Sequence, residues 1–418
     1  MKPLLHALLT CTILATAATL CGAADLPQII LPKHRLQASD LAIIVNDADP
    51  LSRQIANYYQ QRRGIPPANL IHISFAPGRS ALSAVEFVAL KQQVDAATPA
   101  TIQAYALTWA APYRVECMSI TSAFALGFDK RYCSAKTCAL TQPTAYFASD
   151  STAPFTDFKI RPTMAIAAKD FSAAKQLIDR GIASDGSRPK GTAYLVSTTD
   201  KARNARAPAY ALIKKVFSPF LNTEVVRLNT LLDREDVLFY FTGLAQVKGI
   251  NTLTYLPGAV ADHLTSTGGK LTDSGQMSAL RWLEAGATGS YGTVVEPCAH
   301  TGKFPNPGLM MQHYVQGETL IEAYWKSVQM PGEGIFIGEP LAAPFDFQDI
   351  ERQPDQIVVR TWSIKPGVYQ LQHAPTTVGP YQPLLNYQIG FPLDALRIPD
   401  RGAAVYRMMP LRAPRPVQ

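Results

Sequence analysis

Short apolar runs alternate with amphipathic segments along most of this 418-residue chain. The run LAIIVN at 41–46 is typical of a buried strand, and Leu51, Ile55, Tyr58 and Tyr59 follow at the spacing of one helix face. The same order predicts strands at 70–75, 104–109, 164–168, 193–197, 237–242, 252–256 and 288–294, and helices at 84–96, 171–180, 207–217, 276–285 and 318–328. Alternating elements of these lengths form βαβ units, so we expect an α/β fold with a mostly parallel sheet covered by helices.

Two segments depart from this alternation. Residues 110–160 are rich in Cys, Ser, Thr and aromatic residues without a period, which predicts an insertion held by disulfides. After Phe345, strand-like runs at 356–364, 367–373, 387–389 and 405–408 are separated by Pro and Gly turns. We therefore expect an α/β domain over residues 25–345 and a small β-rich module over residues 346–418 that packs on it.

Residues 1–24 have the pattern of a secretory signal peptide. A positive start, Met1-Lys2, precedes a mostly apolar stretch that ends in small residues before Asp25. The stretch is short for a membrane anchor and is broken by polar residues. We expect an exported protein, periplasmic or extracellular, with no membrane span after cleavage.

The net charge of +7 is mild for this length, and no run of five Lys or Arg residues concentrates it. This composition predicts no nucleic-acid partner. The chain also lacks HExxH, P-loop, GxSxG and dinucleotide-binding glycine patterns, so we expect no cofactor of those types. A C-x4-C spacing without a second close pair is a weak zinc signature, and we expect no metal site.

Four cysteines remain after the expected signal peptide: Cys117, Cys133, Cys138 and Cys298. An even number of cysteines in an exported protein favours disulfides over free thiols. The most local pairing joins Cys133 to Cys138 and leaves Cys117 for Cys298. The other two connectivities stay open at this point.

Several passages resemble a family of secreted bacterial proteins that has no assigned activity. They are residues 52–66 (SRQIANYYQQRRGIP), 107–114 (LTWAAPYR), 119–129 (SITSAFALGFD), 179–181, 200–206 (DKARNAR), 256–269 (LPGAVADHLTSTGG) and 285–307. The resemblance covers most of residues 40–345. It implies a common fold and export, but no reaction.

A second resemblance concerns the fold. The segments 237–243, 252–258, 280–292, 317–328 and 338–341 are similar in order and spacing to the catalytic domain of gingipain-type peptidases, which is a caspase-like α/β fold. In those peptidases a His follows one strand in a His-Gly turn, and a nucleophilic Cys follows the next strand. Here Thr242 precedes Gly243, and 257–260 contains no Cys. The resemblance therefore implies the fold and argues against cysteine-peptidase chemistry.

The best candidate site follows the predicted strand at 252–256. Asp262, His263, Thr265 and Ser266 lie there in a Gly-rich stretch, and open α/β sheets bind ligands at the carboxyl ends of their strands. An imidazole with a carboxylate can carry out acid/base chemistry. The alternative is that Asp262 caps a turn and His263 bonds to the backbone.

Further candidates follow other strands. Glu296 comes after the strand at 288–294 and could serve as the partner carboxylate of His263, while Cys298 could instead form a thiolate–imidazole pair with a histidine if it is not in a disulfide. Arg114 could clamp an anionic group, with Trp109 beside it, or it could pair with an acid such as Glu116.

Two groups on predicted helices or turns complete the set. Asp200, Arg203, Asn204 and Arg206 follow the strand at 193–197 and could line one edge of the cleft or belong to a solvated turn and helix start. Glu318 and Glu322 lie one helical turn apart, a spacing that fits either a ligand pair or two exposed acids.

Two functions remain open. The first is a hydrolase-like enzyme, with His263 as acid/base, Asp262 or Glu296 as its carboxylate, and a substrate-binding set formed by Arg114, Trp109, Asp200, Arg203, Thr265 and Ser266. The second is a non-catalytic protein that uses the same cleft to bind a peptide or a cell-envelope polymer.

Overall fold

The computed structural model describes residues 26–134, 137–391, 393 and 395–411. The expected signal peptide lies outside these residues. No helix within them is long and apolar enough to cross a membrane.

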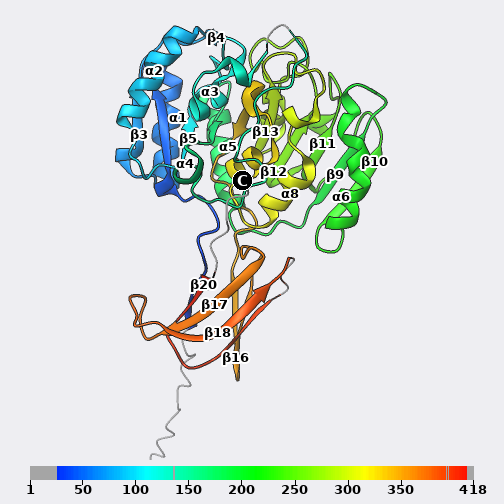
Figure 1. The fold of residues 1–418 in the computed structure, drawn as a ribbon. Coiled ribbons are helices and arrows are strands. Elements are labelled where there is room, and N and C mark those ends of the chain that lie inside the picture. The colour runs from blue at the N-terminus through cyan, green and yellow to red at the C-terminus, as the bar shows by residue number, and fades with distance from the viewer. Residues whose placement is uncertain (1–25, 135–136, 392, 394, 412–418) are drawn as a thin grey trace, which may run out of the picture.

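A ten-stranded sheet forms the centre of the molecule, with the order β10-β9-β11-β12-β13-β14-β8-β5-β2-β3 (Figure 1). The first five strands in this order, β10 to β13, are parallel to one another, and so are the last four, β8, β5, β2 and β3. Between the two groups, β14 is antiparallel to β13 and pairs with β8 at one residue pair. The strands are β2 (Leu41–Asn46), β3 (Leu70–Ile73), β5 (Ala104–Leu107), β8 (Thr163–Ala165), β9 (Thr192–Ser197), β10 (Asn222–Arg227), β11 (Val237–Thr242), β12 (Tyr255–His263), β13 (Gly289–Thr293) and β14 (Gly334–Gly338). The expected α/β class is confirmed, and the sheet is mixed.

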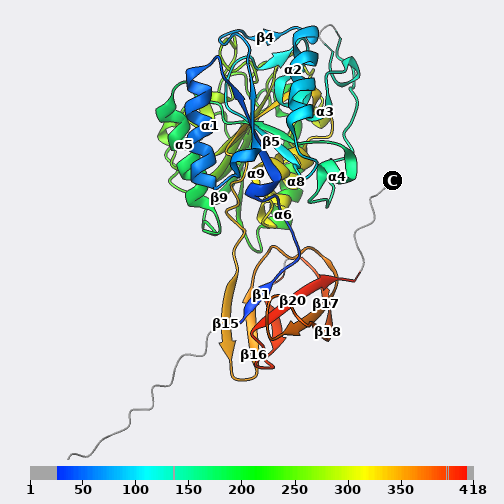
Figure 2. The same ribbon diagram turned by 90° about the vertical axis from the view of Figure 1, so that its left-hand side faces the viewer.

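Helices cover both faces of this sheet (Figure 2). Helices α1 and α5 pack together on one face, and α2 and α3 lie on the other. The helices are α1 (Pro50–Arg63), α2 (Ala84–Ala97), α3 (Ile120–Leu126), α4 (Pro154–Phe158), α5 (Phe171–Ser184), α6 (Tyr210–Phe217), α7 (Leu280–Ala285), α8 (Pro307–Val315) and α9 (Leu320–Ser327), and a 3₁₀ segment, η4 (Arg203–Ala209), precedes α6.

Local sequence explains where α1 begins and ends. The side chain of Asp49 accepts a hydrogen bond from the backbone N–H of Leu51, and Pro50 occupies the first turn, where its missing N–H costs nothing. Gly64 ends the helix in the left-handed conformation, with φ 63°. These signals place α1 between β2 and β3, as the sequence predicts.

Two of the predicted boundaries that differ are instructive. We expected one helix to end at residue 180, but α5 continues to Ser184, and Gly181 within it allows close packing, since a Cβ there would lie 2.6 Å from Cγ of Glu339. We expected a strand at 252–256, but β12 runs from Tyr255 to His263. Asp262 and His263 are therefore the last two residues of a strand and not part of a turn.

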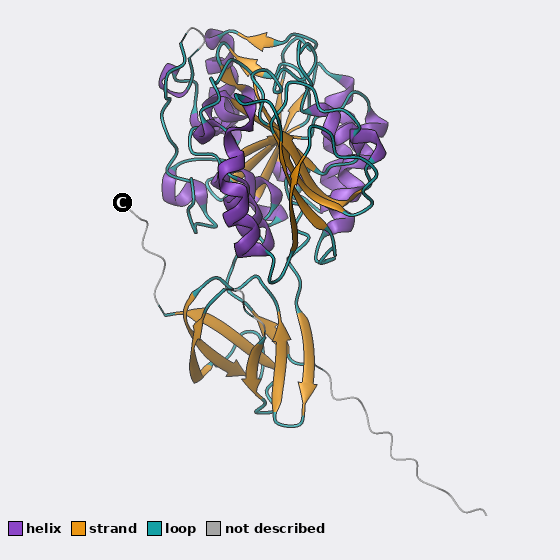
Figure 3. Cartoon of the chain, turned by 90° about the vertical axis from the view of Figure 1, so that its right-hand side faces the viewer, coloured by secondary structure: helices purple, strands orange, loops and turns teal. Residues whose placement is uncertain are grey.

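The C-terminal residues form two small sheets without a helix (Figure 3). One has the order β1-β20-β17-β18 and the other β15-β16-β19. The strands are β1 (Gln28–Ile30), β15 (Asp349–Gln353), β16 (Gln356–Arg360), β17 (Gly367–Ala374), β18 (Gln382–Ile389), β19 (Leu396–Pro399) and β20 (Val405–Pro410). Because β1 pairs with β20, the start of the described chain lies with these sheets.

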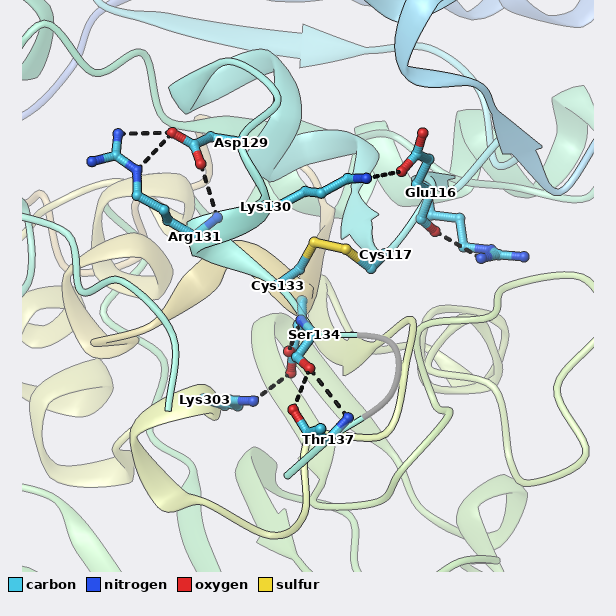
Figure 4. The surroundings of a disulfide bond; sticks show 11 residues. Glu116, Cys117, Asp129, Lys130, Arg131, Cys133, Ser134, Thr137 and Lys303 are labelled. Atoms are coloured by element: carbon cyan, nitrogen blue, oxygen red, sulfur yellow. Dashed lines mark hydrogen bonds and ion pairs between the residues drawn. A yellow bond between two sulfur atoms is a disulfide. The ribbon is translucent and has the colours of Figure 1, made fainter. Parts of the chain in front are cut away.

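A third small sheet joins β4 (Ala81–Leu82) to two strands of the insertion, β6 (Arg114–Val115) and β7 (Met118–Ser119). Both disulfides involve cysteines of the insertion. Cys117 is joined to Cys133, and Cys138 to Cys298. The local pairing that we expected, Cys133 with Cys138, is therefore wrong. The end of α3 and the turn after it bring Cys133 back to Cys117 (Figure 4), while Cys138 reaches the loop after β13.

Candidate functional site

Loops that follow several strands of the main sheet meet at one edge. The hydroxyl of Tyr113, after β5, donates to Oδ1 of Asp273, after β12, at 2.6 Å. Arg206, after β9, donates to the carbonyl oxygen of Thr242 at the end of β11, at 2.7 Å. These contacts assemble the kind of sheet edge at which open α/β folds bind ligands.

Asp262 lies in a buried ion pair at this edge. Its side chain is 1% exposed, and Oδ1 is 2.6 Å from Nη2 of Arg206. The contact is an ion pair without hydrogen-bond alignment. Burial raises the pKa of Asp262, and the guanidinium of Arg206 opposes that rise. The carboxylate is thus committed to Arg206 and is not in a turn-capping role.

His263 is buried on the opposite face of the sheet. Its Nδ1 accepts a hydrogen bond from the indole N–H of Trp282 at 2.9 Å, so Nε2 carries the proton and donates to the carbonyl oxygen of Met277 at 3.0 Å. The side chain is 1% exposed, and burial lowers the pKa of His263 to about 4. The ring is therefore neutral, and neither nitrogen is free to move a proton for a substrate.

The pleat of β12 separates these two residues. Asp262 is in register with Phe241, and both contribute to the side of the sheet that includes Tyr291. His263, the next residue along the strand, points to the opposite face, where Tyr240 and Trp282 lie. Asp262 consequently does not orient His263, as expected for adjacent residues that point different ways.

Glu296 and the residues after it also have local roles. Glu296 is exposed, and its Oε1 accepts a hydrogen bond from the backbone N–H of Cys298 at 2.8 Å. Cys298 is in a disulfide, so it supplies no thiolate, and the nearby His300 lies 3.3 Å from the carbonyl oxygen of Cys138 through Nε2. The structure therefore does not bring Glu296 to His263.

Trp109 is a core residue and not a binding platform. It is 3% exposed, its indole N–H donates to the carbonyl oxygen of Pro112, and its ring packs edge-on against Phe75 and Phe124. Arg114 is half-buried and donates to the carbonyl oxygen of Glu116 at 2.7 Å. Figure 4 shows the carboxylate of Glu116 paired with Lys130 beside a disulfide. Neither Trp109 nor Arg114 therefore lies with the other predicted site residues.

The remaining predicted residues do come together. Arg203 donates from Nη1 to Asp200 Oδ2 at 3.0 Å and from Nε to Thr265 Oγ1 at 3.1 Å. Thr265 in turn donates to Gln276 Oε1 at 2.6 Å, and Ser266 is adjacent in the chain. We call this group, Asp200, Arg203, Thr265, Ser266 and Gln276, the Arg203 surface.

The Arg203 surface is polar and partly open to solvent. The side chains of Asp200 and Arg203 are 23% and 26% exposed. Partial burial acts to raise the pKa of Asp200, but the backbone N–H and guanidinium of Arg203 outweigh it and hold that pKa below its usual value. Gly243 permits this arrangement, because a Cβ there would lie 1.9 Å from the backbone oxygen of Arg203.

The sequence pointed to Arg206 as a residue that could line the cleft, but it did not predict that Arg206 pairs with Asp262. Sequence reasoning missed two other partners at this edge, Trp282 and Gln276, and no signal pointed to them. Their roles depend on how the segment after β12 folds back.

Two further observations limit the chemistry. Among the described residues, no group of three or more His, Cys, Asp or Glu side chains is arranged to hold a metal ion. Pockets of about 220, 530 and 580 Å³ are lined by residues other than Asp262, His263, Glu296 and Arg203.

Comparison with known proteins gives only distant likenesses. No family model and no curated protein matches the chain. A solved structure described as a protease matches with a TM-score of 0.43 and 9% identity, over 90% of this chain and 98% of that one. The complex of the pro- and mature domains of RgpB from Porphyromonas gingivalis matches with a TM-score of 0.40 and 8% identity, over 88% of this chain and 94% of that one. At these scores the likenesses carry no argument about this chain's reaction.

Proposed function

We propose that this chain is an exported binding protein on a caspase-like fold, and that it holds a peptide at the Arg203 surface without hydrolysing it. One contrast carries the proposal. Arg203 and Asp200 contact each other and are partly exposed, and Arg203 also bonds to the buried Thr265. Asp262 and His263, in contrast, are both buried and have protein partners.

Hydrolysis by the expected route needs a nucleophile and a base with a free nitrogen. The four cysteines that follow the expected signal peptide are all in disulfides. Both ring nitrogens of His263 have protein partners. Freeing the ring of His263 would require opening the core around Trp282, which is fully buried.

The chemistry of the Arg203 surface suits a peptide. Arg203 offers charged donors and the carboxylate of Asp200 offers acceptors, so the surface can bond to both the C=O and the N–H groups of an extended chain. The charges of Arg203 and Asp200 compensate each other, which favours a neutral backbone over a strongly charged polymer. Two disulfides fit an oxidising compartment, which supports export.

The test combines turnover and binding. The purified protein is incubated with pooled peptide, ester and glycan substrates, and no hydrolysis above background is expected. Binding to a peptide array is then compared for the wild type, Arg203→Ala, and the control Lys201→Ala, an exposed residue of the same turn. Arg203→Ala should lose most of the binding, and Lys201→Ala should retain it.

Three outcomes would count against the proposal. Hydrolysis that disappears in His263→Asn would restore the enzyme hypothesis. Binding of peptides that is the same in Arg203→Ala would place the site elsewhere. Binding of isolated cell-envelope polymer in preference to peptides would assign the surface to a different ligand.

A further inference from the structure

We propose a second binding site, for an apolar organic carboxylate, in the pocket that contains Arg161. The pocket has a volume of about 530 Å³ and lies among the carboxyl ends of α2, α3 and α4. It borders Tyr105 near the start of β5, whereas the Arg203 surface lies at the carboxyl ends of the strands. The proposal is therefore independent of the function proposed above.

Arg161 is the feature that points to an anion. It is 7% exposed, yet no carboxylate of the described residues is within hydrogen-bond distance of it. Its Nε donates to the carbonyl oxygen of Ile102 at 3.0 Å, and its Cζ lies 3.3 Å from the centre of the Phe155 ring. These contacts fix the plane of the guanidinium, and its other neighbours are Asp95, 3.9 Å from Nη1, and Tyr105, whose ring centre is 5.5 Å from Cζ. The five N–H donors of the group exceed these partners, so the Nη atoms retain capacity for a ligand.

The nearest acid does not neutralise Arg161. Asp95 Oδ1 is 3.9 Å from Nη1, and both oxygens of Asp95 accept hydrogen bonds from Lys91, the longer at 2.6 Å. Lys159, which also lines the pocket, contacts the carbonyl oxygen of Thr156 and the face of Phe155. With Lys91 and Asp95 compensating each other, Arg161 and Lys159 leave the lining with an excess of positive charge.

The walls determine what kind of anion fits. Phe124, Ala125, Leu126 and Phe155 provide apolar surface, so the pocket favours an acid with an apolar body over inorganic phosphate. A planar guanidinium edge matches the two oxygens of a carboxylate. A free organic acid and the C-terminus of a peptide share this chemistry.

The experiment measures binding by isothermal titration calorimetry on the full mature protein. The probes are 3-phenylpropanoate, its neutral amide, inorganic phosphate, and a short peptide ending in Phe with either a free or an amidated C-terminus. We expect saturable binding of the acids and weaker binding of their amides. Whichever acid binds more tightly, the free acid or the peptide, identifies the source of the ligand.

Three variants locate the site. Arg161→Gln should weaken binding of the acids about tenfold or more, because a charge-assisted hydrogen bond is lost. Ala100→Trp fills the exposed rim without touching Arg161 and should abolish binding, which keeps the test valid if Arg161→Gln does not fold. Lys215→Gln removes one positive charge from an exposed position on α6 and should have no effect.

The proposal is overturned by any of three results. One is the absence of saturable binding for both acids. Another is equal binding of an acid and its amide, which would mean that the carboxylate is not recognised. The third is a result from the variants that does not locate the site: binding that is retained in both Arg161→Gln and Ala100→Trp, or binding that falls as much in the control Lys215→Gln as in Arg161→Gln.

Discussion

The buried state of His263 predicts a specific dependence of stability on pH. The ordinary pKa of a histidine is 6.5, and burial lowers that of His263 to about 4 in the folded protein. Above pH 7 the ring is neutral in both the folded and the unfolded protein, so it does not make the free energy of unfolding depend on pH. As the pH falls below 6.5, the unfolded chain binds a proton that the folded chain does not bind until about pH 4. The free energy of unfolding therefore falls across this window.

The size of the effect follows from the two pKa values. Their difference corresponds to a total decrease of about 3 kcal/mol in the free energy of unfolding, which is reached below pH 4. About 2 kcal/mol of this decrease occurs between pH 7 and pH 5. The side chain is 1% exposed, so solvent does not screen the burial that causes it. The window lies above the range in which most carboxylates titrate, which makes it measurable.

The assay is urea unfolding at pH 7 and pH 5 for the wild type, His263→Asn and His72→Asn. The asparagine side chain does not titrate, and its amide oxygen can accept from Trp282 in place of Nδ1. It is too short to reach Met277 as Nε2 does, and the stability lost with that bond is the same at both pH values. The loss of stability between the two pH values should be smaller in His263→Asn by about 2 kcal/mol. His72 is exposed, and removing its ring should leave the wild-type loss within about 0.5 kcal/mol.

Two results would refute this reasoning. One is the same loss of stability in His263→Asn as in the wild type. The other is a ring resonance of His263 that titrates near pH 6.5 in NMR spectra of the folded protein. Either result would mean that the ring exchanges protons with solvent, and it would make His263 available as a base again.

The remaining predictions concern the disulfides, a buried lysine and a glycine. Peptide mapping without reduction should find Cys138 joined to Cys298, and a peptide that joins Cys133 to Cys138 would contradict the structure. Lys326→Met should lower the free energy of unfolding by about 3–5 kcal/mol in urea titrations, because it leaves the buried Glu318 with less compensating charge. A loss below about 1 kcal/mol would argue against the ion pair between Lys326 and Glu318. Gly243→Ala should reduce peptide binding on the array by displacing the backbone of the Arg203 surface, and unchanged binding would show that the surface tolerates the methyl group.

Elements with a strong period and clear end signals could be predicted from the sequence. The strand β2 is a continuous apolar run, and α1 has a cap, a proline and a terminal glycine. The edge strand β10, NTEVVR, was missed because few of its residues are apolar. Helix α8 was missed although Asn306 and Pro307 form a recognisable start.

The candidate site was only partly predictable, because its geometry depends on the end of one strand. The expected strand ended at residue 256, which would leave Asp262 and His263 in a loop where both side chains could turn toward a ligand. In β12 they are consecutive strand residues, so the pleat sends them to opposite faces. Arg203 and Thr265 lie in contact, since both follow strands and approach the same edge from different loops.

Glu318 shows why burial of charge is hardest to foresee. The sequence allowed an exposed acid or a ligand, but the side chain is fully buried, with Lys326 at 2.7 Å, Lys365 at 2.6 Å and His313 at 3.2 Å. Burial acts to raise the pKa of Glu318, but its cationic neighbours outweigh this and lower it. Lys365 comes from the linker between β16 and β17, so the pairing joins the C-terminal sheets to α9. A charge that is satisfied by a remote segment leaves no local pattern, whereas removing either partner should loosen both parts of the molecule together.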